Sequence, residues 1–253
     1  MLFDSHINID LSNFSPNLTL PNFLVGGVLW SDYFPTVIFA KLLSTLFKRA
    51  FKGSLILNEY VGGFNLKLVE YVISRGCKII SMPTLSAWWF KHFHGSAGGY
   101  VIYSLDGKIR GEVIDLLYTL AENNCVLCTG FLAYGEIRRL IEEADAIGVN
   151  KVVVLDIMNP VMRDVYERIR ELAKYNHIFF EVRLSSVKDV DTLIHILSHL
   201  RSVLDEHRIL LSSGSGIDTL NSYWPKTLSR LKSYFNERFV SLITFENQRD
   251  CFG

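Results

Sequence analysis

The sequence predicts an α/β protein with a (β/α)8 TIM-like barrel, formed as a single domain over residues 1–253 with a long loop inserted after the fourth strand. Two observations carry this prediction: eight short apolar runs, and amphipathic segments with helical spacing between them. The composition agrees, because 49% apolar and 21% charged residues are typical of a globular protein. A chain of 253 residues also has the size at which single barrels are common.

The eight apolar runs have the composition of strands buried on both faces, since Val, Ile, Leu and Phe dominate them. In chain order they are Leu2–Asn8, Leu24–Trp30, Ser54–Asn58, Cys77–Met82, Cys125–Gly130, Lys151–Asp156, His177–Arg183 and Arg208–Ser213. Three segments between them repeat apolar residues at i, i+3, i+4 and i+7 and predict helices; they begin at Val113, Ile137 and Val190. An open, doubly wound sheet would alternate similarly, but no glycine-rich phosphate loop follows the first strand.

One connection is unusually long and aromatic. It runs from Leu85 to Tyr100 after the fourth predicted strand, so in a barrel it lies at the C-terminal mouth. Its segment Trp88–Phe93 could cover a pocket as a lid or form a contact surface, and both uses stay open. His92 and His94 form an H-x-H pair in this loop, which we expect to be exposed rather than to bind a metal.

The charge balance and the hydropathy pattern exclude several partners. Lys plus Arg number 26 and Asp plus Glu also number 26, so a nucleic-acid partner is not expected. No apolar run is long enough to span a membrane, and the first residues do not form a signal peptide. We therefore expect a cytoplasmic protein that binds a small polar molecule, with a homo-oligomer left open. Cys125 and Cys128 should face opposite sides of a strand, so no disulfide or shared metal is expected.

The first predicted strand carries polar residues at every second position. Asp4, His6 and Asn8 should therefore have their side chains on one face of that strand. Barrel interiors are normally filled by branched apolar residues, and catalytic groups gather at the C-terminal ends of the strands. We take His6 as a candidate catalytic residue, and Asp4 and Asn8 as candidate substrate-binding residues.

Polar residues also lie at the ends of the other predicted strands, where they could ring a pocket at the barrel mouth. Asp156 ends the sixth strand, and we take it as the second candidate catalytic residue. Glu181 lies between Phe180 and Val182 in the seventh strand, so we expect it to have a buried partner. The further candidate substrate-binding residues are Asp32, Asn58, Thr84, Glu181 and Ser213.

A few stretches are specific enough to compare with a known family. They are Leu57–Asn65, which reads LNEYVGGFN, then Ser81–Thr84, which reads SMPT, and Cys125–Gly130 followed by Glu136. Together with the ending Asn247–Gly253, they resemble an uncharacterised amidohydrolase-like family, a domain-of-unknown-function group of metal-dependent hydrolase-type barrels. The resemblance covers nearly the whole chain and implies the same barrel fold.

The sequence departs from that family where the resemblance implies metal ligands. The family's first strand carries D-x-H-x-H, and its second histidine is Asn8 here. Phe131 and Asp156 stand at two further histidine positions, and Gly214 stands at an aspartate position. His6 is the one expected histidine ligand left, with Asp156 as a candidate oxygen ligand. Because a catalytic metal needs about three protein ligands and an open position, we interpret the chain as a barrel that has lost its metal centre.

Three functions stay open from the sequence. The favoured one is a non-catalytic or repurposed barrel that binds a small polar ligand or a protein partner at its mouth, without a cofactor. The second is an active hydrolase of an amide, lactone or phosphoester, in which His6, Asp156 and Glu181 hold one divalent metal such as zinc. The third is metal-free acid–base chemistry with Asp156 or Glu181 as the base and His6 as its partner, which a raised carboxylate pKa would support.

Overall fold

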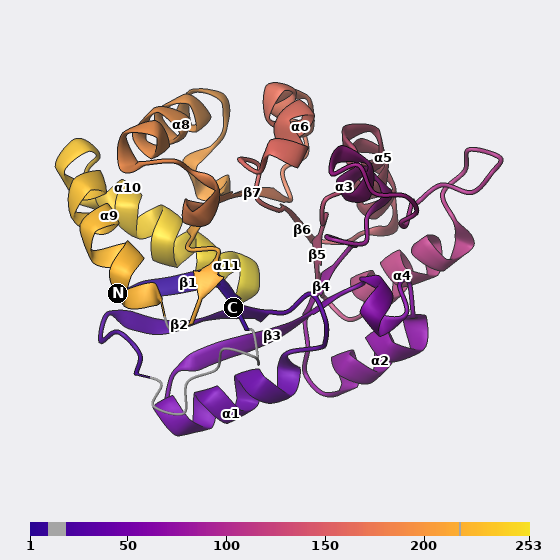
Figure 1. The fold of residues 1–253 in the computed structure, drawn as a ribbon, viewed down its shortest axis with the longest axis horizontal. Coiled ribbons are helices and arrows are strands. Elements are labelled where there is room, and N and C mark those ends of the chain that lie inside the picture. The colour runs from indigo at the N-terminus through magenta and orange to yellow at the C-terminus, as the bar shows by residue number, and fades with distance from the viewer. Residues whose placement is uncertain (10–18, 218) are drawn as a thin grey trace.

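The computed structural model describes residues 1–9, 19–217 and 219–253. In this part of the chain, nine parallel strands form one curled sheet in the order β8-β7-β6-β5-β4-β3-β2-β1-β9 (Figure 1). They are β1 (Leu2–Asn8), β2 (Leu24–Trp30), β3 (Ala50–Ile56), β4 (Ile79–Ser81), β5 (Val126–Cys128), β6 (Lys151–Val154), β7 (Ile178–Arg183), β8 (Ile209–Ser212) and β9 (Ser215–Gly216). Because β9 follows β8 after two residues and pairs with β1, the sheet closes into the predicted barrel.

Helices surround this sheet on its outer side (Figure 1). The longer ones are α1 (Val37–Phe47), α2 (Leu66–Ser74), α4 (Gly111–Glu122), α5 (Tyr134–Ile147), α8 (Val190–Val203) and α9 (Leu220–Tyr234). The three helices predicted from apolar spacing are confirmed as α4, α5 and α8, and each buries its apolar stripe. The short elements are η2 (Glu59–Val61), α3 (Trp88–Phe93), η3 (Pro160–Met162), α6 (Arg163–Glu167), α7 (Ile169–Leu172), η4 (Leu184–Ser186), η5 (Glu206–Arg208), α10 (Glu237–Ser241), the π-helical η6 (Leu242–Glu246) and α11 (Asn247–Phe252).

The barrel interior is filled by apolar side chains from the strands and from α11. This inner cluster contains Phe3, Val28, Trp30, Ile56, Ile79, Val126, Cys128, Val153, Leu155, Leu210, Cys251 and Phe252. Helix α11 lies beside β1 in Figure 1 and is fixed near the beginnings of the strands. Asn247 Nδ2 donates to the carbonyl of Ile209 at 2.8 Å, and Lys151 Nζ donates to that of Cys251 at 3.1 Å. The end of the chain therefore closes the base of the barrel and leaves the other end for the mouth.

The third strand begins earlier than predicted. It runs over Ala50–Ile56 rather than Ser54–Asn58, because the chain already pairs with β2 at Ala50. Gly53 weakens the strand signal in the sequence, yet the packing needs it there. A Cβ at Gly53 would lie 2.3 Å from Cα of Val37, so only glycine lets α1 begin this close to β3.

Two smaller expectations are confirmed. Cys125 belongs to the outer core and Cys128 to the inner cluster, so the two thiols face opposite sides of the sheet. The inserted loop after β4 holds the short helix α3; His92 on this helix and His94 directly after it are both exposed. Among the described helices, none is long and apolar enough to cross a membrane.

Candidate functional site

Several of the polar residues predicted at strand ends meet at one rim of the barrel. Glu181 lies in β7, Asp156 follows β6 after one residue, and His6 lies in β1. The C-terminal ends of parallel strands in a barrel meet at the same face, which brings these three side chains together. All three are buried. We call this group, with Arg183 of β7, the mouth cluster.

Both carboxylate oxygens of Glu181 have partners in and around the mouth cluster. Its Oε2 accepts hydrogen bonds from Arg183 Nε at 2.8 Å and from the backbone N–H of Asp156 at 3.2 Å. Its Oε1 accepts from Ser212 Oγ at 2.8 Å and lies 3.4 Å from His6 Nδ1. The expected buried partner of Glu181 is therefore present, and both carboxylate oxygens are occupied.

The guanidinium of Arg183 lies between two carboxylates. Its Nη1 is 3.9 Å from Asp156 Oδ2, which is too long for a direct hydrogen bond. Its Nη2 is buried and has no hydrogen-bond partner among the described residues. Gly214 makes room for this side chain, because a Cβ there would lie 3.0 Å from Arg183 Cδ and 2.3 Å from Ser185 Oγ. Any side chain larger than that of glycine at position 214 would therefore collide with Arg183 and Ser185.

Asp156 has an uncommon backbone conformation. Its φ of 44° lies in the left-handed region, which a residue other than glycine adopts only when its surroundings hold it there. Its Oδ2 accepts from Ser186 Oγ at 2.7 Å and from Asn159 Nδ2 at 3.4 Å. Its Oδ1 is buried without a partner in the described part of the chain. One acceptor atom of this carboxylate thus receives no hydrogen bond from the described residues.

His6 is held between an aromatic ring and a carboxylate. Its imidazole stacks on the indole of Trp30, with ring centroids 4.7 Å apart and an interplanar angle of 8°. Burial and the positive charge of Arg183 lower the pKa of His6 more than the charge of Glu181 raises it. The imidazole is therefore neutral at pH 7, and its contact with Glu181 is not an ion pair.

The two buried carboxylates differ in their pKa. Burial works to raise the pKa of Glu181, but neighbouring groups, Arg183 first among them, hold it at about 2. Burial raises the pKa of Asp156 above its ordinary value, although Arg183 and Ser186 offset part of the effect. Of the two residues considered as bases, Asp156 is the one with the raised pKa, whereas Glu181 stays ionised.

A second group of predicted residues is joined by hydrogen bonds at the ends of β2, β3 and β4. Asn58 Nδ2 donates to Asp32 Oδ1 at 3.1 Å and to Thr84 Oγ1 at 2.9 Å. Thr84 Oγ1 donates to the same oxygen of Asp32 at 2.5 Å. Although burial opposes it, nearby carboxylates, with Asp32 among them, raise the pKa of Arg183. The two groups therefore interact electrostatically across the mouth.

The expectation that Asp4, His6 and Asn8 share one face of the first strand is wrong. The pairing of β1 with β2 shifts register between Asp4 and Ile7, and such an irregularity breaks the strict alternation of side chains. Asp4 faces α9, where Trp224 Nε1 donates to its Oδ2 at 3.0 Å. His6 instead faces the mouth cluster.

Asp4 and Ser213 are engaged mainly in closing the barrel. The backbone N–H of Ser213 donates to Asp4 Oδ1 at 3.0 Å, and Ser213 Oγ donates to the carbonyl of His6 at 3.1 Å. Asn8 is exposed, and its Nδ2 donates to the carbonyl of Gly214 at 2.9 Å. These contacts join β1 to the β8–β9 segment, and a role of the three residues in substrate binding stays a prediction.

The aromatic loop lies against the mouth cluster through α3. Trp89 Nε1 donates to the carbonyl of Val161 in η3 at 2.8 Å. The ring of Phe90 stacks on Phe131, with centroids 5.5 Å apart. The ring of Phe131 in turn lies 5.9 Å from Cζ of Arg183, in a cation–π contact. These contacts pack α3 onto the rim of the mouth, and its use as a lid or as a contact surface stays a prediction.

Sequence reasoning missed Arg183 and Ser186 as site residues. The available signal was the spacing of Glu181 and Arg183, which stand two residues apart in an otherwise apolar strand. Alternate residues share a face, and a buried arginine needs a carboxylate, so the pair could have been predicted. Ser186 leaves no comparable signal, because serine is common after strands for other reasons.

The donor set of the mouth does not fit a divalent metal. Within the described ranges, no group of three or more His, Cys, Asp and Glu side chains is arranged to hold an ion. The cation of Arg183 lies 2.8 Å from Glu181 and 3.9 Å from Asp156, so it would repel a metal bound by these carboxylates. No chemical step at the mouth is therefore attributed to a metal ion.

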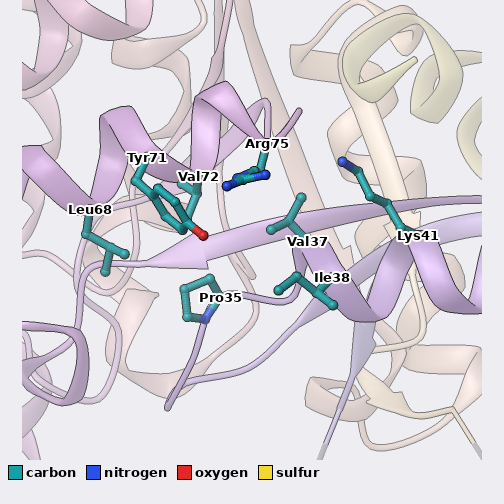
Figure 2. Close-up of a pocket in the computed structure, with 8 residues that line it drawn as sticks. All are labelled: Pro35, Val37, Ile38, Lys41, Leu68, Tyr71, Val72 and Arg75. Carbon is teal, nitrogen blue, oxygen red and sulfur yellow. The ribbon is translucent and has the colours of Figure 1, made fainter.

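A second candidate site is an apolar groove on the outer side of the barrel (Figure 2), and its lining includes no residue of the mouth cluster. It has a volume of about 390 Å3 and lies between α1 and α2, with Val37 and Ile38 on one wall and Leu68 and Tyr71 on the other. Two cations, Lys41 and Arg75, line it as well, but no carboxylate does. The groove lacks the paired acid and base that the mouth offers, so the mouth is the better candidate site.

Comparison with known proteins yields one family and a set of similar folds. Residues 23–181 match the model of a family of unknown function (DUF6282). No curated protein matches the chain. Among solved structures, one from Pseudomonas putida, named a 2-pyrone-4,6-dicarboxylic acid hydrolase, is 12% identical, covers 100% of this chain and 97% of its own, and has a TM-score of 0.61.

Two further solved structures have a similar fold. One from Acinetobacter baumannii, also named a 2-pyrone-4,6-dicarboxylic acid hydrolase and solved with citric acid bound, is 15% identical, covers 100% and 99% of the two chains, and has a TM-score of 0.59. A metallopeptidase named a dipeptidase is 12% identical, covers 100% and 98%, and also has a TM-score of 0.59. At these identities the likeness establishes a TIM-like barrel fold and nothing finer.

Proposed function

The chain belongs to the family of unknown function DUF6282, and we propose that it binds a small polar molecule at the barrel mouth in a site that uses no metal ion. The observation that carries this proposal is the buried guanidinium of Arg183 among the carboxylates of Glu181 and Asp156. A fixed organic cation there supplies the positive charge that a divalent ion supplies in a metal-dependent barrel.

Unsatisfied polar atoms support a ligand at this place. Arg183 Nη2 and Asp156 Oδ1 are both buried without partners among the described residues. A buried polar group left unpaired costs about 1–3 kcal/mol, so a molecule that pairs with both atoms gains that stabilisation on binding. Two similar barrels are named for a dicarboxylic acid, and one of them holds citric acid, so polar ligands have precedent in this fold.

The same residues would carry chemistry if the bound molecule is converted. Asp156 and His6 are then the proposed catalytic pair, because the pKa of Asp156 is raised by burial and His6 is neutral and fixed by Trp30. Asp156 would take up a proton from the bound molecule, and Arg183 would stabilise negative charge that develops nearby.

The test is the metal content of the protein purified without chelator, measured by elemental analysis beside His6→Ala. His195→Ala, which changes an exposed histidine of α8, serves as the matched control. We expect no stoichiometric zinc, manganese or iron in any of the three proteins, no rise in Tm on adding metals, and a rise in Tm with some members of a polar-ligand panel. About one equivalent of metal that His6→Ala alone abolishes would overturn the proposal and favour an active metal-dependent hydrolase.

A further inference from the structure

The mouth cluster contains two charged side chains of opposite sign, Arg183 and Asp156, that do not bond directly to each other. Arg183 and Asp156 approach to 3.9 Å, and no direct hydrogen bond joins them. Each is held back by another contact: Glu181 accepts from Arg183 Nε, and Ser186 donates to Asp156 Oδ2. The two side chains are thereby fixed in place before any ligand arrives, which lowers the ordering cost of binding.

Each side chain keeps one buried atom without a partner among the described residues. Arg183 Nη2 can only donate a hydrogen bond, and ionised Asp156 Oδ1 can only accept one. A ligand that pairs with both atoms therefore carries an acceptor and a donor. An acceptor of negative charge and a donor of positive charge give the stronger bonds, because charge-assisted hydrogen bonds exceed neutral ones.

The charge balance of the mouth distinguishes among ligands of this kind. Glu181 already neutralises Arg183, and Asp156 and Asp32 add two further carboxylates. A simple carboxylate would enter a site of net negative charge, and a simple ammonium ion would leave the donor atom of Arg183 unpaired. A zwitterion satisfies both atoms and adds no net charge.

We propose that the mouth binds the head group of a free α-amino acid, with its carboxylate on Arg183 and its ammonium group on Asp156. This inference rests on the proposed function, because it requires a polar ligand rather than a metal at the mouth. It goes further by naming the chemical class of that ligand and by giving each of its two charged groups a partner.

The first experiment compares small probes of the head group by ligand-detected NMR at about pH 7. Glycine carries both charged groups, methylammonium and acetate carry one each, and acetamide carries a neutral donor and acceptor. We expect glycine to bind about tenfold or more tightly than each of the other three, which is what one lost charge-assisted bond costs. Acetate or acetamide binding as tightly as glycine would overturn the assignment.

The second experiment changes the partner of the ammonium group. Asp156→Asn keeps the size of the side chain and removes its charge, so we expect glycine to bind about tenfold more weakly and acetate to bind at least as tightly as before. Asp115→Asn, an exposed position on α4, is the matched control and should leave both affinities unchanged. Glycine binding that does not weaken in Asp156→Asn would contradict the assignment of the ammonium group.

A screen of the twenty common amino acids by thermal shift separates the two proposals. If no amino acid raises the Tm but other polar molecules do, the amino-acid inference is wrong and the proposed function stands. If no polar molecule binds and one equivalent of metal is found, both are wrong. A rise in Tm with one or a few amino acids, lost in Asp156→Asn and kept in Asp115→Asn, supports the inference and identifies the side chain that the site prefers.

Discussion

Replacement of Glu181 by Gln tests the electrostatic account of the mouth. The pKa of Glu181 falls from its ordinary 4.5 to about 2 in the folded chain. Since one pKa unit corresponds to about 1.4 kcal/mol, ionised Glu181 stabilises the folded state by about 3 kcal/mol. Gln keeps the shape but removes the negative charge that pairs with the buried cation of Arg183, and this lost attraction is the main source of the effect. We expect the free energy of unfolding at pH 7 to fall by about 3 kcal/mol.

The pH dependence of the same variant tests whether the charge of Glu181 is the cause of the stabilisation. Because the folded-state pKa of Glu181 is depressed, its stabilisation is present above about pH 4.5 and is lost as the pH falls towards 2. Urea unfolding followed by tryptophan fluorescence at several pH values should therefore show the wild type and Glu181→Gln converging in acid. Glu122→Gln, exposed at the end of α4, is the control and should be neutral. A difference below about 1 kcal/mol at pH 7, or one that persists unchanged near pH 2, would refute the reasoning.

Three further outcomes are expected. Trp89→Phe removes the hydrogen bond to the carbonyl of Val161, so hydrogen exchange over residues 85–100 should accelerate while global stability falls by about 1 kcal/mol. Unchanged exchange would show that other contacts hold this segment in place. Phe252→Ala opens a cavity at the base of the barrel and should cost about 3–5 kcal/mol in urea unfolding, and a loss below about 1 kcal/mol would contradict the packing of α11 into the barrel base. The pKa of His6 is lowered, so the unfolded chain binds a proton there more readily; stability should fall as the pH drops below about 6.5, and His6→Gln should flatten that slope.

The fold was largely predictable because barrel strands and helices have distinct periodicities. The buried runs and the helices α4, α5 and α8 were identified from apolar spacing alone. The start of β3 was not, since Gly53 weakens a strand signal and its reason for being there, the close approach of Val37, is a tertiary contact. The ends of a strand depend on contacts with neighbouring elements, and the local sequence pattern does not contain these contacts.

The site was predictable only in part, for a related reason. Glu181 was recognised because a carboxylate in an apolar strand demands a partner, and that partner exists. Asp4 and His6 were placed on one face because strict alternation was assumed, whereas the register shift in β1 turns them to different neighbours. A strand irregularity of this kind arises from pairing with another strand and leaves no trace in the residues of the strand itself.

The closure of the sheet through β1 and β9 has a consequence for synthesis of the chain. The contact of Asp4 with Ser213 joins residues that are 209 positions apart, so β1 keeps one edge unpaired until Ser215 and Gly216 have left the ribosome. Such non-local pairing folds slowly, and an open strand edge can pair with another chain in the meantime. We expect the nascent protein to depend on chaperones over this interval, and its yield to respond to the rate of translation more than that of a protein with local contacts.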